Sequence, residues 1–355
     1  MIGNGYSSAG VPAFVLALAM AWVPETATAD AIITLTGPTS NAGTINLSTA
    51  DDNYGGLVMA GGVTGYSLWS LLGTITTSTP PGDNGKNAIL RYYVLATGAN
   101  GSQSLVSLGE INPTFTGTAN PDLVTVSGNT ASLAFTLPGA AGRDVTNLTS
   151  LQLLSVPALP ALPSGSPTPP STSVTLAGNV SFPGAYTFQG SDPQNVPPIM
   201  ETVNNDTYTG PPLFNLIDPI DSNILNQYVV TAATDGYEVL FSLAELDPAF
   251  GASTALNQID LVPYADTAGN FPGAALARIV TPGDTPFAHG RWVSNLDLIA
   301  VDAVPEPATF ALLLTGLIGM ALGGLCRPAA KRNALLAACH SDGWAALPGF
   351  VFDGI

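Results

Sequence analysis

Two arginines in the C-terminal part of the chain, Arg278 and Arg291, carry the side chains best suited to holding a small anionic ligand. A guanidinium group binds a carboxylate or a phosphate through two parallel hydrogen bonds. Acidic residues also lie close by in the sequence, so the alternative is an internal ion pair with Asp284 or Asp297. The residues therefore allow either a weak ligand site or a structural role.

His289 is the only histidine between residues 30 and 303. A metal site needs further ligands, and a catalytic base needs a nucleophile and an orienting acid. The sequence shows no further metal ligand, nucleophile or orienting acid associated with His289. This favours a loop position over a catalytic role for the histidine. Both cysteines, Cys326 and Cys339, lie outside this region, which therefore contains no disulfide and no thiolate metal site. We expect no catalytic residue and no metal ligand.

The region that must position these side chains contains an internal repeat. Ser107 to Phe115 (SLGEINPTF) corresponds residue for residue to Ser242 to Phe250 (SLAELDPAF). Further matches follow in the same order: YVL 93–95 with YVV 228–230, Asn100-Gly101 with Asp235-Gly236, Asp122-Leu123-Val124 with Asp260-Leu261-Val262, and GRDVTNL 142–148 with GRWVSNL 290–296. Repeated matches in one order indicate a duplicated unit. We expect two tandem domains, residues 30–156 and 173–303, joined by a stiff Pro-, Ser- and Thr-rich linker at 157–172.

Each copy should be built from short strands and short helices. In the second copy, residues 228–232 are rich in β-branched residues and predict a strand, Asp235-Gly236 predicts a hairpin turn, and residues 237–241 predict the partner strand. Ser242 and Glu245 then have the spacing of a helix capping box, with Pro248 ending the helix. Further elements are expected as a helix at 213–217 and strands at 175–177 and 298–301. These elements predict a strand-rich α+β fold.

Two sets of repeated residues have competing interpretations. Glu245, and Glu110 at the same place in the first copy, are explained by capping rather than by catalysis. The aromatic residues at matching places are Tyr66, Trp69, Tyr208 and Phe214. Their repetition favours core packing over a sugar-binding platform, because core positions are what a repeat must keep.

The composition is that of an acidic, weakly charged protein. It has a net charge of −17, only 9% charged residues, 38 Gly and 30 Pro. Nucleic acid and anionic membranes are excluded as partners, because phosphate contacts require Lys and Arg. The scarcity of Lys, Glu and Arg favours a β-rich exported protein over a helical one.

Segments at both ends indicate export. Residues 1–29 predict a signal peptide, with an apolar stretch at 11–23 and a small-residue cleavage pattern at 27–29. The alternative for this segment is a buried N-terminal helix. Near the other end, residues 310–326 contain no charge and predict a transmembrane helix, and basic residues follow it. A triplet, Pro305, Glu306 and Pro307, precedes this apolar run, and the basic residues that follow it are Arg327, Lys331 and Arg332.

Residues 304–332 resemble the PEP-CTERM sorting signal of bacterial exported proteins, because the Pro-Glu-Pro triplet, the apolar run and the basic cluster occur in order. The resemblance implies retention at the inner membrane, processing near the triplet by an exosortase, and transfer to the cell surface or its exopolysaccharide. An ordinary uncleaved single-pass anchor is the alternative. Residues 333–355 extend past the usual end of the signal, as a cytoplasmic tail or as the product of a shifted reading frame.

The second copy also resembles the molybdopterin-binding domain of sulfite-oxidase-type oxidoreductases, through residues 208–213, 278–284 and 290–299. The resemblance implies that fold and a molybdopterin cofactor. In that family a cysteine thiolate ligates molybdenum shortly before the aromatic-Thr-Gly segment, but residues 201–207 and 59–64 contain no Cys. We therefore expect a surface-sorted, non-enzymatic binding or structural protein without a cofactor, whose partner is an envelope polysaccharide. A molybdopterin-dependent oxidoreductase is the alternative.

Overall fold

The structure is a computed structural model. It describes residues 30–48, 53–78, 85–116, 122–156, 173–187, 196–203, 205–252, 260, 265–266, 278–284 and 289–304. The predicted signal peptide, the linker 157–172, the transmembrane segment 310–326 and the tail 333–355 lie outside the described residues. Residues up to Asp302 belong to one compact unit, and only 303 and 304 are described of the second unit. Across the described ranges, no helix is long and apolar enough to cross a membrane.

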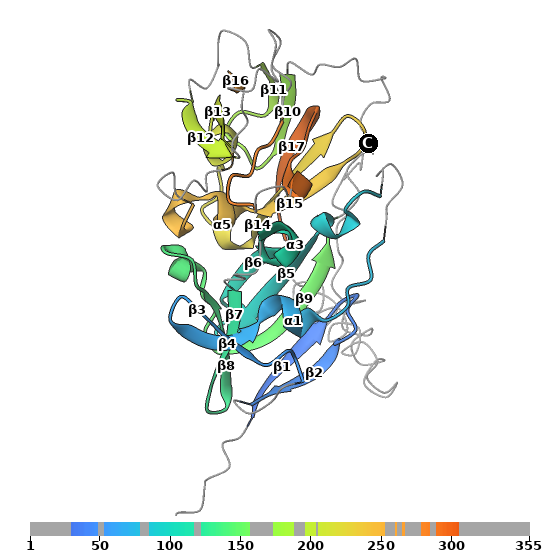
Figure 1. Ribbon diagram of the computed structural model, residues 1–355, viewed down its shortest axis with the longest axis vertical. Coiled ribbons are helices and arrows are strands. Elements are labelled where there is room, and N and C mark those ends of the chain that lie inside the picture. The colour runs from blue at the N-terminus through green and yellow to red at the C-terminus, as the bar shows by residue number, and fades with distance from the viewer. Residues whose placement is uncertain are drawn as a thin grey trace, which may run out of the picture. The chain divides into compact units, whose positions relative to one another are not determined.

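In the first half, residues 30–156, the described residues form two sheets (Figure 1). One has five strands in the order β2 (Gly43–Leu47), β1 (Ala31–Thr36), β9 (Leu148–Ser155), β5 (Tyr92–Gly98) and β6 (Gln103–Ser107). The other has β3 (Leu57–Ala60), β4 (Val63–Ser67), β7 (Asp122–Ser127) and β8 (Thr130–Phe135). β1 and β9 pair in parallel, so the first and last strands of this half are neighbours.

The second half, from residue 173, has a five-stranded sheet with the corresponding order. It consists of β11 (Gly184–Thr187), β10 (Ser173–Gly178), β17 (Leu296–Ala303), β14 (Gln227–Ala233) and β15 (Glu238–Ser242). β10 and β17 again pair in parallel. A smaller sheet contains β12 (Ile199–Val203), β13 (Asp206–Gly210) and β16 (Ala265–Asp266). The predicted strands at 175–177, 228–232 and 298–301 fall within these elements, and the predicted strand at 237–241 overlaps β15, which begins one residue later.

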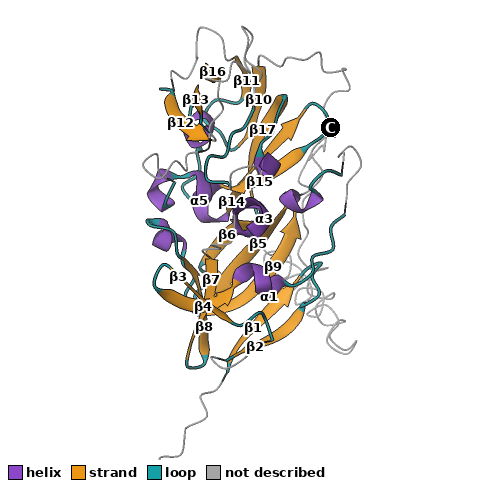
Figure 2. Cartoon of the chain, viewed as in Figure 1, coloured by secondary structure: helices purple, strands orange, loops and turns teal. Residues whose placement is uncertain are grey.

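The helices are short and lie between the strands (Figure 2). The α-helices are α1 (Leu68–Leu72), α2 (Leu108–Ile111), α3 (Pro113–Thr116), α4 (Leu213–Ile217) and α5 (Leu243–Leu246). The 3-10 turns are η1 (Ala88–Arg91), η2 (Ala140–Arg143), η3 (Ile224–Asn226), η4 (Pro248–Phe250) and η6 (His289–Arg291). The predicted helix at 213–217 is α4, and the helix capped by Ser242 is α5. The fold is strand-rich α+β, as predicted.

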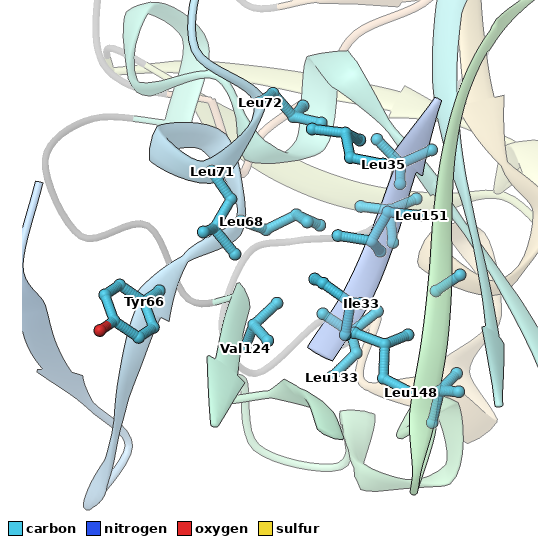
Figure 3. Packing of buried hydrophobic residues seen from close by; sticks show 14 of the residues in the cluster. Ile33, Leu35, Tyr66, Leu68, Leu71, Leu72, Val124, Leu133, Leu148 and Leu151 are labelled. Carbon is cyan, nitrogen blue, oxygen red and sulfur yellow. The ribbon is translucent and has the colours of Figure 1, made fainter. Parts of the chain in front are cut away.

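Each half has its own hydrophobic core, and Figure 3 shows part of the first. On β1, Ile33 and Leu35 are buried while Thr34 between them is exposed, because alternate side chains of a strand point to opposite faces. Leu68, Leu71 and Leu72 of α1 belong to the same cluster, as does Tyr66. The core of the second half also includes Leu90 and Phe115, which come from the first half.

The repeated aromatic residues pack inside the protein. Tyr66 is fully buried and Tyr208 is 4% exposed. Trp69 packs against the first core and Phe214 against the second. This location agrees with the core-packing interpretation of the four residues.

Candidate functional site

Two helix caps set the positions of the glutamates at the candidate site. The hydroxyl of Ser107 accepts a hydrogen bond from the backbone N–H of Glu110, and Ser242 does the same for Glu245, each at 3.1 Å. The Glu245 carboxylate also accepts from the Ser242 backbone N–H at 2.8 Å, which completes the predicted capping box. In the first half only the serine part of the box is observed.

The Glu110 carboxylate instead pairs with an arginine. Both its oxygens accept from Arg143, with the Nη2–Oε2 bond at 2.8 Å. In the second half Arg291 pairs with Glu245 at 3.2 Å, and with Asp260 and Asp284 at 3.5 Å each. A guanidinium group offers five N–H donors in a fixed plane, which lets one arginine serve several carboxylates.

The two sets of charged residues exchange hydrogen bonds across the halves. Ser107 donates to Glu245 Oε1 at 2.9 Å, and Ser242 donates to Glu110 Oε2 at 3.3 Å. Arg143 adds a bond of 3.2 Å to the Ser242 hydroxyl. Each glutamate is thus held by residues of both halves. We call this set the seam, and it consists of Ser107, Glu110, Asp122, Arg143, Ser242, Glu245, Asp260, Asp284 and Arg291.

Aromatic rings cover the two arginines of the seam. The Arg143 guanidinium lies 4.1 Å from the centroid of the Phe135 ring, and that of Arg291 lies 4.8 Å from the Phe241 ring. An arginine over an aromatic face is attracted by the electron-rich ring. Both arginines are buried, with 2% and 6% of their surface exposed. The rings therefore shield these ion pairs from water on one side.

Other contacts join the halves beside the seam. The rings of Tyr93 and Tyr228, which correspond in the repeat, stack with their centroids 5.5 Å apart and an interplanar angle of 26°. Arg91 pairs with Glu238 at 2.6 Å. The seam itself lies where the end of β6 and α2 meet the end of β15 and α5.

Burial dominates the electrostatics of the seam. It raises the pKa of Glu245 to about 7, against the opposing effect of Arg291. It also raises the pKa of Asp284 to about 6 and that of Asp260 well above its ordinary value. The pKa of Asp122 is likewise raised well above its ordinary value, first by burial and then by the nearby Glu110 carboxylate. Burial thus makes Asp122, Glu245, Asp260 and Asp284 bind protons more readily in the folded protein than in the unfolded chain.

A pocket of about 180 Å³ opens onto the seam. Its walls include the paired residues Glu110, Arg143, Glu245 and Arg291. A pocket of mixed charge can admit water or a small polar group. Its charged walls already pair with one another, however, and none of their contacts identifies a ligand.

The structure separates the two arginines that were predicted as ligand contacts. Arg291 lies in the seam and pairs with Asp284, which agrees with the ion-pair interpretation. Arg278 is half-buried in an isolated bridge with Ser294 and does not line the seam pocket. The side chain of His289 lies outside what the structure describes, as do Pro305, Glu306, Pro307, Arg327, Lys331 and Arg332 of the sorting signal.

The seam as a unit was not predicted from the sequence. A signal for it exists in the repeat, where Glu110, Asp122 and Arg143 correspond to Glu245, Asp260 and Arg291. With only 9% of the chain charged, three matched charged positions per half are a pattern that core packing does not require. The pairing of each serine with the other half's glutamate has no such signal, because no local pattern encodes it.

The residues present do not fit a molybdopterin. Residues 59–64 form the hairpin of β3 and β4, where Met59 is 75% exposed, and residues 201–207 span the hairpin of β12 and β13. Neither hairpin offers a thiolate for molybdenum. Arg143 and Arg291, two of the basic residues that would be needed to hold the pterin phosphate, are engaged by carboxylates. Among the described residues there is also no group of three or more His, Cys, Asp or Glu arranged to hold a metal ion.

No protein-family model matches the chain, and a search of curated proteins found no significant match.

Proposed function

We propose that this chain is an exported, membrane-anchored and surface-sorted protein that acts as a non-enzymatic binding or structural module of the cell envelope or its exopolysaccharide matrix. The observation that carries this proposal is the use of the buried charged side chains. Glu110 and Glu245 pair with Arg143 and Arg291 within their own halves, and each glutamate also accepts a hydrogen bond from a serine of the other half. A reaction at one of these groups would first have to break its ion pair, which is costly for buried charges.

We further propose that the halves are two copies of one domain, at 30–156 and 173–303. The five-stranded sheets support this, since each has a parallel pair between its first and last strands and an adjacent hairpin, β5–β6 or β14–β15. The capped helices α2 and α5 follow those hairpins at corresponding residues. A likeness of each copy to the sulfite-oxidase-type domain remains part of the proposal and rests on the sequence motifs.

The proposed location rests on the terminal segments. Residues 304–332 have the order of a PEP-CTERM signal, and an exosortase-type enzyme is the implied partner. The test is the mass of the protein recovered from the cell surface. A product that ends near Pro305-Glu306-Pro307 is expected. A surface product that still carries residues 333–355 would refute processing, and Glu306→Ala is the variant expected to retain the protein at the membrane.

The non-enzymatic role is tested by the metal and pterin content of the protein purified from a host that makes molybdopterin. We expect neither molybdenum nor pterin, since both hairpins lack the soft ligand. Molybdenum bound at one equivalent per chain would refute this role and favour an oxidoreductase with a different ligand.

A further inference from the structure

A second pocket, separate from the seam, has a volume of about 340 Å³. Pockets that bind small molecules have volumes of roughly 300–1,000 Å³, so this one lies at the lower end of that range. We call it the Trp292 pocket. Both halves build it, because Lys86 and Asn87 come from the first half and Tyr237 and Trp292 from the second.

One wall of the Trp292 pocket is held in place by hydrogen bonds. Tyr237 is 6% exposed, and its hydroxyl accepts from Asn87 Nδ2 at 3.1 Å and donates to the Gly290 carbonyl. Its backbone N–H donates to Asp235 Oδ1 at 3.1 Å. The Lys86 ammonium lies 5.5 Å from the centre of the Tyr237 ring. Because the Tyr237 ring is already held in place, it loses little further conformational entropy when a ligand packs against this wall.

The second aromatic residue is Trp292, which is half-buried. Its ring meets that of Tyr208 edge to face, with centroids 5.5 Å apart and an angle of 85°. Tyr208 itself is buried, so it supports the tryptophan from the protein side. The pocket thus has two supported aromatic residues in its lining.

The aromatic residues of this pocket are not shared by the two halves, although Tyr237 also belongs to the core of the second half. In the repeat, Tyr237 corresponds to Ser102 and Trp292 to Asp144. The backbone around them is nevertheless kept: Asn147 and Asn295 correspond and have φ of 51° and 54°. Their carbonyls accept matching hydrogen bonds, from Ala99 at 2.9 Å and from Thr234 at 3.0 Å. The two halves therefore share the frame and differ in the side chains that line the pocket.

The chemistry of the lining selects a ligand class. Neutral polar side chains, Asn87, Ser294 and Asn295, supply both donors and acceptors, and the charges of Lys86 and Asp235 balance. Such a lining favours a neutral molecule with many hydroxyl groups over an anion. Sugar rings also carry C–H faces that pack against aromatic rings. We propose that the Trp292 pocket binds one or two residues of a neutral polysaccharide.

This inference deepens the proposed binding role, on which it rests, by naming a site and a ligand class. The test is calorimetric titration of the full chain in mild detergent with neutral tetrasaccharides of glucose and of N-acetylglucosamine. Glycine and inorganic phosphate serve as zwitterionic and anionic probes. Ser294 is exposed at the pocket, so Ser294→Trp should fill it without removing a packed side chain. The matched control is Thr146→Trp, at the corresponding exposed position of the first half.

We expect a tetrasaccharide to bind, Ser294→Trp to weaken the affinity about tenfold or more, and Thr146→Trp to leave it unchanged. Sugar binding that Ser294→Trp and Thr146→Trp affect equally would refute this site and leave a binding role intact. The absence of sugar binding, or a preference for glycine or phosphate, would refute the ligand class. A second readout is tryptophan fluorescence, which should respond to the sugar in the native chain and not in Trp292→Phe. Neither readout depends on molybdenum content or on the site of processing.

Discussion

Ser107 donates a hydrogen bond of 2.9 Å to Glu245, a residue that lies in the other half of the chain. The same oxygen of Glu245 accepts the backbone N–H of Ser242, whose own hydroxyl donates to Glu110 of the first half. A helix cap, which is normally a local device, therefore also connects distant parts of the sequence here. The stability of the two capped helices should depend on contact between the halves.

Replacing Ser107 by Ala should lower the free energy of unfolding by about 1–2 kcal/mol, because it removes both a helix cap and the bond to Glu245. Urea denaturation measures the change. Ser127→Ala, at an exposed strand end, is the control and should change stability by less than about 0.5 kcal/mol. In combination with Glu245→Gln the effects should not add, because the two side chains touch. Strict additivity would show that the bond between the halves contributes nothing.

Replacing Arg291 by Met should destabilise the protein by about 3–5 kcal/mol, because it leaves the buried carboxylates without their cation. Chemical denaturation followed by circular dichroism is the measurement. Lys86→Met removes an exposed cation and provides the comparison. If the two variants lost stability equally, the ion pairs of the seam would have no structural role.

Stability should fall as the pH rises from about 5 to about 8. Burial raises the folded-state pKa of Glu245 to about 7 and of Asp284 to about 6, above their unfolded values. The folded protein therefore binds more protons than the unfolded chain in this range, and deprotonation costs it stability. Urea midpoints at several pH values measure the slope, and Asp284→Asn should reduce it near pH 6. A stability that rises with pH across this range would contradict the prediction.

Replacing Gly109 by Ala should destabilise the protein by about 1–3 kcal/mol, although alanine favours helices. A Cβ atom at this position of α2 would lie 2.8 Å from Cδ of Arg291. The repeat supplies the comparison, because the corresponding residue in α5 is Ala244. Thermal unfolding of Gly109→Ala measures the effect. A gain in stability would mean that Arg291 has room to move, against the packing described for the seam.

The sequence predicted elements whose causes are local. The turn at Asp235-Gly236, the cap at Ser242 and the helix from Leu213 each depend on a few adjacent residues, and each is observed. The parallel pairing of β1 with β9 joins residues more than a hundred positions apart. The sequence of neither strand specifies its pairing partner, so the order of the strands in the sheet could not be predicted.

The same limit applies to the candidate site. Asp284 was weighed as a partner of Arg291 because it is close in sequence, and the pair is observed. Asp260 and Glu245 are also partners of this arginine, but they lie farther from it in the sequence, and no local pattern links them to it. Glu110 was explained by capping alone, whereas its carboxylate pairs with Arg143. Ion pairs between elements depend on tertiary packing, which local spacing does not reveal.

The bonds Ser107–Glu245 and Ser242–Glu110 are one contact made twice with the roles exchanged, which is the isologous pattern of a two-fold dimer. The ion pair of Arg91 with Glu238 breaks this symmetry, because the corresponding residues are Asn226 and Gln103. If the first halves of two molecules paired in the same way, Arg91 would face Gln103 and the ion pair would be lost. A single chain that contains both halves therefore favours pairing of its own unlike halves over exchange of like halves between molecules.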